Sequence, residues 1–123
     1  VSWAVGIGGD CLIGSDFADW LMALEADTET RVTIIFGELG GAYEERVAQA
    51  IKASLIKKPV IAFVAGDFAA RLPSGVQFGH AGALLEGGRG RPAAKRAALA
   101  AAGALVATKF DELIKLVEQA APR

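Results

Sequence analysis

Short apolar runs of strand length alternate along this chain with segments that have helical periodicity. The clearest runs are Val32–Phe36 and Val60–Val64, which are rich in β-branched residues and end close to glycine and an acidic residue. Ser2–Ile7 and Leu105–Val106 are two further runs that we expect to form short strands. Because strands that are separated by helices usually pair in parallel, with the helices packed on both faces, the sequence predicts a three-layer α/β sandwich with a mainly parallel sheet.

Four helices are predicted between and after these strands. The apolar positions of three of them recur every three or four residues: Phe17, Trp20, Leu21 and Leu24; Tyr43, Val47, Ile51 and Leu55; and Phe110, Leu113, Ile114 and Val117. The remaining helix is rich in alanine, begins at Pro92 and stops at Gly103, which is the usual order of these two residues. We expect Ser15 and Thr108 to cap the first and the last helix.

The composition limits what such a chain can bind. Its 123 residues form one domain, and its net charge of −1 argues against a general electrostatic grip on nucleic acid or on anionic lipid. The apolar stretches are strand-sized and interrupted, so no membrane span is expected. The single cysteine, Cys11, permits no internal disulfide and indicates a reducing, cytoplasmic compartment.

The predicted strands end in glycine and acidic residues. These ends are Gly8-Gly9-Asp10, Gly37-Glu38 and Ala65-Gly66-Asp67, and a loop with the only histidine, His80, follows the third of them. In parallel sheets, ligands gather at the carboxyl ends of the strands. The sequence therefore predicts that three acidic residues and one imidazole lie on the same rim of the sheet.

The histidine loop allows two interpretations. His80 lies between Gly79 and Gly82, and flanking glycines let a backbone come close to a ligand. An imidazole titrates near neutral pH, which suits proton or phosphoryl transfer. Spacing alone favours the other interpretation, in which a lone histidine is a surface residue or a hydrogen-bonded structural residue.

Three motifs occur in order along the chain: Val5-Gly6-Ile7-Gly8-Gly9-Asp10, Gly37-Glu38-Leu39-Gly40-Gly41 and Gly79-His80-Ala81-Gly82-Ala83. Together they resemble the ligase (C-terminal) domain of the nucleoside-diphosphate-forming acyl-CoA synthetases, the superfamily of the succinyl-CoA synthetase alpha subunit and ATP-citrate lyase. The resemblance covers nearly the whole chain and implies a flavodoxin-like fold. The residues before His80 are similar to the citrate branch and those after it to the succinate branch, so the acid substrate stays open.

The resemblance implies that His80 takes phosphate from ATP or GTP and passes it to a carboxylate, after which coenzyme A attacks the acyl phosphate. Glu38 matches the glutamate that contacts this histidine. A carboxylate that accepts a hydrogen bond from one ring nitrogen leaves the other nitrogen as the nucleophile. The residues expected near the phosphate or ligand are Gly8, Gly9, Asp10, Gly40, Gly41, Gly79 and Gly82.

As a member of this superfamily, the chain would be a single CoA-ligase domain over residues 1–123 that lacks its first strand–helix unit. A coenzyme A-binding domain and an ATP-grasp partner would hold most of the coenzyme A, the nucleotide and Mg²⁺, and no metal is expected on this chain itself. We therefore expect a part of an oligomeric assembly that is inactive alone. Its exposed first strand would invite association.

Two other functions stay open. A non-catalytic binding or regulatory domain can use the same fold with the histidine idle, because fold does not fix function. A receiver domain phosphorylated on aspartate is disfavoured, since it has no use for a Gly-His-Ala-Gly loop. We also expect Asp67 to be a strand-end cap without a chemical role. The basic residues near Pro92 are expected to form a solvated face, with contact to a phosphate or to an acidic patch of a partner as the alternative. These basic residues are Arg89, Arg91, Lys95 and Arg96.

Overall fold

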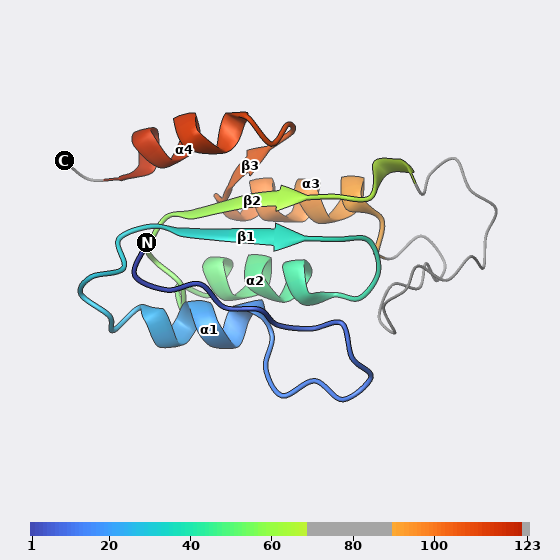
Figure 1. The fold of residues 1–123 in the computed structure, drawn as a ribbon, viewed down its shortest axis with the longest axis horizontal. Helices are drawn as coiled ribbons and strands as arrows, with labels where there is room; N and C mark the ends of the chain where they lie inside the picture. Colours follow the sequence, from blue (N-terminus) through green and yellow to red (C-terminus); the bar gives the residue numbers. More distant parts are fainter. Residues whose placement is uncertain (69–89, 122–123) are drawn as a thin grey trace.

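The computed structural model describes residues 1–68 and 90–121. Its elements are, in chain order, α1 (Phe17–Leu24), β1 (Thr33–Gly37), α2 (Tyr43–Lys52), β2 (Val60–Val64), α3 (Pro92–Ala102), β3 (Leu105–Ala107) and α4 (Glu112–Ala120) (Figure 1). The strands form one parallel sheet in the order β1-β2-β3. The predicted α/β class is confirmed. Within the described ranges, none of the helices has the length and apolar character needed to span a bilayer.

Helices cover both faces of the sheet. The helices α1, α2 and α3 pack on one face, where Ala18, Val47 and Leu99 share a core with the inward residues of β1 and β2. Helix α4 packs on the opposite face, where Leu113 meets Ile61 of β2 and a residue of β3. Figure 1 shows α1 and α2 on one side of β1 and β2, and α4 on the other. The result is the predicted flavodoxin-like sandwich of three layers, with β2 in the middle of the described sheet.

The boundaries of α3 and β2 agree with the prediction. Pro92 is the first residue of α3, and Gly103 ends the helix in the left-handed conformation, with a φ of 101°. β2 covers Val60–Val64 and follows directly after Pro59. Both elements are bounded by residues with strong backbone preferences, which explains why the sequence predicted their ends correctly.

The predicted first strand is wrong, because residues 2–7 have no strand conformation and are mostly exposed. Ser2 Oγ is hydrogen-bonded to Thr30 Oγ1 at 3.2 Å, and the indole N–H of Trp3 donates to Asp27 Oδ2 at 2.9 Å. These contacts hold the segment beside the connection from α1 to β1. A strand needs the backbone of a neighbouring strand, and among the described residues β1 pairs with β2 alone.

Both predicted helix caps are also wrong. Asp16, not Ser15, caps α1: its carboxylate accepts from the N–H of Asp19, and the Asp19 carboxylate accepts from the N–H of Asp16. Aspartate caps as well as serine does, and its charge suits the positive end of the helix. Thr108 lies upstream of α4, and its N–H donates to Glu112 Oε2 at 2.7 Å.

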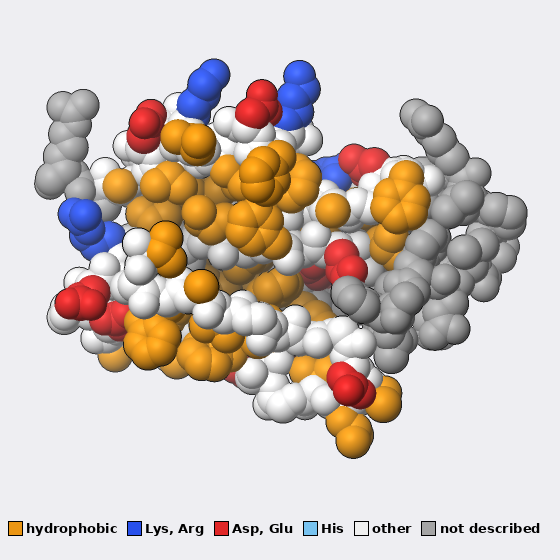
Figure 2. Space-filling model, in the orientation of Figure 1, with side chains coloured by type: hydrophobic (Ala, Val, Ile, Leu, Met, Phe, Trp, Pro, Cys, Tyr) orange, Lys and Arg blue, Asp and Glu red, His pale blue; other side chains and the backbone are white. Residues whose placement is uncertain are grey.

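Three residues that were predicted to face the core are exposed. Leu55 follows the end of α2, Phe110 precedes α4, and Ile114 lies on α4; their exposed fractions are 56%, 66% and 70%. The ring of Phe110 stacks against Phe36 of β1, which is itself 55% exposed. Helix α4 packs on β2 and β3 and leaves β1 open on this face. Figure 2 shows hydrophobic side chains gathered near the centre of the viewed surface.

Candidate functional site

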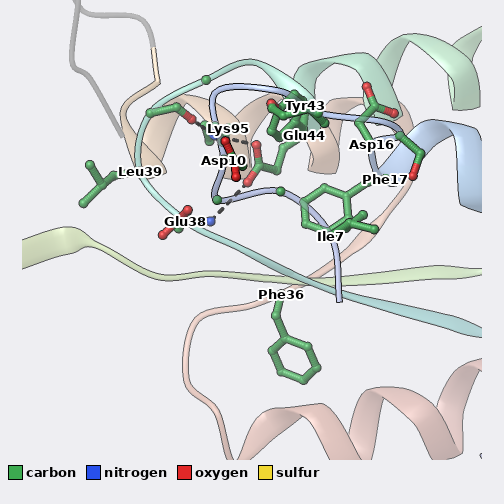
Figure 3. Close-up of a pocket in the computed structure, with 16 residues that line it drawn as sticks. Ile7, Asp10, Asp16, Phe17, Phe36, Glu38, Leu39, Tyr43, Glu44 and Lys95 are labelled. Carbon is green, nitrogen blue, oxygen red and sulfur yellow. Dashed lines mark hydrogen bonds and ion pairs between the residues drawn. The ribbon is translucent and has the colours of Figure 1, made fainter. Parts of the chain in front are cut away.

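A cavity of about 280 Å³ lies at the carboxyl end of β1 (Figure 3). It is bounded by the loop before α1, the loop from β1 to α2, and Lys95 of α3. Six of the predicted site residues line it together: Gly8, Gly9, Asp10, Glu38, Gly40 and Gly41. The remaining three, Gly79, His80 and Gly82, lie outside the described residues.

The loop after Gly9 folds back on the carboxylate of Asp10. Asp10 Oδ1 accepts hydrogen bonds from Cys11 Sγ at 3.2 Å and from the N–H of Leu12 at 3.3 Å. The Cys11 thiol and then the Leu12 N–H lower the pKa of Asp10 below its ordinary value. Asp10 is therefore ionised at neutral pH, and it caps its own turn while it lines the cavity.

Two helices begin beside the cavity. Asp16 at the start of α1 lines it, and so does Tyr43, the first residue of α2. Asp16 is both the cap of α1 and an ion-pair partner of Arg46 on α2. Helix α2 has Ala42 at its N-cap and receives no hydrogen bond from a side chain there. Because a helix N-terminus presents N–H groups and the positive end of the helix dipole, this corner of the cavity favours an anion.

Glu38 is the first residue after β1, and it is exposed where it lines the cavity. Its backbone N–H donates to Glu44 Oε1 at 3.2 Å. The next residue, Leu39, is only 4% exposed and anchors the loop in the interior. The backbone that carries the predicted catalytic carboxylate is therefore held in place by Glu44 and by the buried side chain of Leu39.

A buried ion pair that the sequence did not predict lies behind this loop. Glu44 of α2 and Lys95 of α3 are each 1% exposed, and the Lys95 ammonium donates to Glu44 Oε2 and to the carbonyl oxygen of Gly40. The dashed lines in Figure 3 join Glu44 to Lys95 and to the backbone of Glu38. The prediction that Lys95 belongs to a solvated face is thus wrong. Its burial is possible because its charge is paired and its ammonium is hydrogen-bonded.

Burial dominates the electrostatics of Glu44. Desolvation raises the pKa of Glu44 above its ordinary value, and the hydrogen bond from Lys95 only partly opposes this rise. Gly37, the last residue of β1, leaves the room that the carboxylate needs. A side chain at this position would place its Cβ 3.0 Å from Glu44 Cδ. The end of β1 and the buried carboxylate are therefore fitted to each other.

Arg96, the neighbour of Lys95 in α3, contacts the end of β2. Its guanidinium donates to the carbonyl oxygen of Val64 at 3.0 Å and to Asp67 Oδ1 at 2.7 Å. Asp67, which was predicted to be a strand-end cap, is thus an ion-pair partner of α3. Two consecutive residues of one helix therefore hold the carboxyl ends of β1 and β2.

The sequence did contain a signal for the buried pair. Glu44 precedes Val47 by three residues and Ile51 by seven, so it shares their helical face. Lys95 likewise precedes the buried Leu99 by four residues. Charged residues of opposite sign on the apolar faces of two helices indicate a paired, buried arrangement, since such residues are rarely buried alone.

Comparison with known proteins finds relatives over almost the whole chain. A protein-family model described as CoA-ligase matches residues 2–105. The chain is 46% identical over 118 residues to the ADP-forming succinate–CoA ligase subunit alpha 1 of Archaeoglobus fulgidus. It is 42% identical over 118 residues to the ADP-forming sulfoacetate-CoA ligase subunit SauD of Bilophila wadsworthia. Each match covers 96% of this chain and 39% of the relative, so the chain spans about two fifths of these curated relatives.

Solved structures share the fold. The ATP citrate lyase of Methanosaeta concilii, solved as a mutant in complex with (3S)-citryl-CoA, matches with a TM-score of 0.84 and 38% sequence identity. The ATP citrate lyase of Methanothrix soehngenii, in complex with citrate and coenzyme A, matches with the same two values. Each match covers 92% of this chain and 18% of the solved chain.

Proposed function

The chain belongs to the CoA-ligase family, and from this premise we propose that it is the phosphohistidine-carrying domain of an ATP- or GTP-dependent acid–CoA ligase. The observation that carries the proposal is the cavity at the end of β1. Six predicted site residues from two separate motifs meet there, on glycine-rich loops and beside the start of α2, which receives no hydrogen bond from a capping side chain. Backbone N–H groups at such places stabilise the charge of a phosphoryl group.

The proposed reaction has three steps. A neutral ring nitrogen of His80 attacks the γ-phosphorus of the nucleoside triphosphate, and the nucleoside diphosphate leaves. A carboxylate of the acid substrate then takes the phosphoryl group, which frees the histidine and forms an acyl phosphate. The thiol of coenzyme A attacks the acyl carbon and phosphate leaves. Glu38 is proposed to accept a hydrogen bond from the other ring nitrogen and so to fix the tautomer of His80.

The nucleotide, Mg²⁺ and coenzyme A are proposed to bind mainly outside this chain, on a coenzyme A-binding domain and an ATP-grasp partner of a cytoplasmic, oligomeric assembly. Among residues 1–68 and 90–121, no group of three or more His, Cys, Asp or Glu side chains is placed to hold a metal ion. The relatives' names contain succinate, sulfoacetate and citrate, which supports a small carboxylic acid as the substrate.

Phosphorylation of the complete assembly tests this proposal. With a triphosphate labelled on its γ-phosphate, we expect a protein-bound label that is lost in acid and survives in base. The label should be absent from His80→Ala and should form more slowly in Glu38→Gln. Asp67→Asn, which alters an acid at the end of the neighbouring strand, should match the native protein.

Two outcomes would reject the proposal. A native assembly that never becomes labelled would point to a non-catalytic binding domain. A label that is lost in base as well as in acid, and that persists in His80→Ala, would point to an acyl phosphate on an aspartate.

We further propose that a strand–helix unit of the same polypeptide, outside these 123 residues, completes this domain. A trough of about 790 Å³ lies between residues 1–7 and β1, and it is lined mainly by apolar side chains. β1 pairs only with β2 in the described part of the chain, and Ile34 and Phe36 on its open face are 41% and 55% exposed. An added strand would satisfy the free edge of β1, and an added helix would cover that face.

The 123-residue chain taken alone is therefore expected to self-associate. Ile34→Lys should weaken this association, because it adds a charge to the open face of β1. Ala101→Lys, an equal change at an exposed position of α3, should leave it unchanged. Sedimentation across a range of protein concentrations measures the effect. A native chain that stays monomeric at every concentration would contradict the expectation.

A further inference from the structure

The buried pair of Glu44 and Lys95 connects three parts of the molecule that are distant in sequence. Glu44 lies in the first turn of α2, Lys95 lies in α3, and the carbonyl oxygen of Gly40 belongs to the loop after β1. Both residues are 1% exposed. A buried pair of this kind contributes little net stability, because its desolvation offsets its attraction. Its position therefore needs another explanation.

Both charged groups bind the backbone of the loop that carries Glu38. Glu44 Oε1 accepts from the N–H of Glu38 at 3.2 Å, and the Lys95 ammonium donates to the carbonyl oxygen of Gly40. The two contacts lie on either side of Leu39, whose side chain is buried. They hold the peptide groups between residues 37 and 38 and between residues 40 and 41, which enclose residues 38–40, and charge-assisted hydrogen bonds are the strong ones.

The same loop is fastened a third time by the segment that leads into α3. The N–H of Gly40 donates to the carbonyl oxygen of Gly90 at 2.8 Å. The two backbones are so close that a Cβ on Gly90 would lie 2.8 Å from the Cα of Gly40. Gly40 thus has both its N–H and its carbonyl oxygen bonded, while the neighbouring Glu38 is exposed at the cavity.

We propose that Glu44 and Lys95 are positioning residues that hold residues 38–40 in one backbone conformation and thereby aim the Glu38 carboxylate. The proposal rests on the proposed function, in which the Glu38 carboxylate accepts a hydrogen bond from His80 during phosphoryl transfer. Glu44 and Lys95 act through the loop and do not touch the reacting atoms. A displacement of about 1 Å at a reacting group can lower a rate on the order of 100-fold.

The test compares two double variants in the full-length protein, assembled with its nucleotide-binding partner. Glu44→Leu/Lys95→Met removes both charges and both contacts with the loop, and it leaves no unpaired charge in the interior. Glu44→Gln/Lys95→Met also removes the charges but retains an oxygen that can accept from the N–H of Glu38. We expect phosphorylation by the first variant to slow by about 10–100-fold with an unchanged KM for the triphosphate. The second should slow less.

Leu99→Ala is the matched control for a general loss of stability. Leu99 lies on the same helix, one turn beyond Lys95, and is fully buried, but it makes none of the loop contacts. This variant should phosphorylate at nearly the native rate. Hydrogen–deuterium exchange of the peptide around residues 36–42 supplies a second readout, and it should increase in the Glu44→Leu/Lys95→Met variant but not in Leu99→Ala.

The outcomes separate this inference from the proposed function. Native phosphorylation kinetics in Glu44→Leu/Lys95→Met would reject the positioning role while the phosphohistidine proposal stands. An equal loss of rate in Leu99→Ala would also reject it, because the effect would then follow from stability. A native assembly that is never labelled would reject the proposed function, and the exchange measurement would still report whether the pair holds the loop.

Discussion

Lys95→Met is expected to lower the free energy of unfolding by about 3–5 kcal/mol at neutral pH. Methionine is similar to lysine in length, so the packing changes little. The Glu44 carboxylate, however, stays buried without its counter-charge, and the carbonyl oxygen of Gly40 loses its donor. Removing one partner of a buried pair is costly because the remaining charge is still desolvated. Denaturant unfolding of the native and variant proteins measures the difference.

The loss in Lys95→Met should shrink as the pH is lowered. Burial raises the pKa of Glu44 in the folded protein above its value in the unfolded protein. In the pH window between these two pKa values, the folded protein therefore binds a proton that the unfolded protein has released. Stability from this group is therefore lost as the pH rises through the window and regained as it falls. Without Lys95 the pKa of Glu44 rises further and the window widens. A stability difference that stays constant from neutral pH to 4.5, the ordinary value, would contradict this explanation.

Glu44→Leu/Lys95→Met is the control for the charge. It leaves no buried ion, so most of the stability that the single substitution removes should return. Should the double variant be as unstable as Lys95→Met, the cost would come from packing or from the unsatisfied loop backbone.

Gly37→Ala is expected to lower the free energy of unfolding by about 1–3 kcal/mol, the usual cost of forcing extra atoms into a packed interior. Gly37 is not among the residues with positive φ, so its backbone conformation permits alanine. The new methyl group would instead lie 3.0 Å from Glu44 Cδ and closer still to Glu44 Oε1. The carboxylate would have to move, and its contacts with Lys95 and with the N–H of Glu38 would be disturbed.

Gly14→Ala is the matched control, because a Cβ at Gly14 meets no heavy atom within 4 Å. Its midpoint of unfolding should stay near that of the native protein. Gly37→Ala should also become nearly neutral in a Glu44→Ala/Lys95→Met background, where the opposing side chain is gone. A full loss of stability in that background would show that the clash with Glu44 is not the cause.

The parts of the fold that the sequence predicted well depend on local chemistry. Pro92 and Gly103 restrict their own backbone, so they mark the ends of α3 whatever surrounds them. The β-branched run of β2 is buried on both faces in the described structure and follows Pro59 directly. The shared location of the glycine and acidic residues at the strand ends could be predicted because, in a parallel sheet, the carboxyl ends of all strands meet at one edge.

The parts that were predicted wrongly depend on partners elsewhere in the chain. Residues 2–7 have a strand-like composition, yet a strand forms only by pairing with another strand, and in the described structure no strand is paired with them. The sequence predicts a surface position for Lys95 because lysine is usually exposed. Its partner Glu44 is 51 residues away, and only the packing of α2 against α3 brings the two together. Phe110 was assigned to the core from its spacing, although the open face of β1 leaves it exposed.

Lys95 and Arg96 are consecutive residues, so their side chains leave α3 about 100° apart. Lys95 reaches Gly40 in the loop after β1, and Arg96 reaches Val64 at the end of β2. The contacts of this pair therefore constrain how many residues lie between Pro92 and Lys95 more tightly than they constrain which residues these are. One inserted residue would rotate both side chains by about 100° and withdraw them from the loop after β1 and from the end of β2 at the same time. Exposed positions such as Ala93 and Ala94 can change in composition without this consequence. Variation among homologous chains should accordingly show substitutions in this turn but no change in its length.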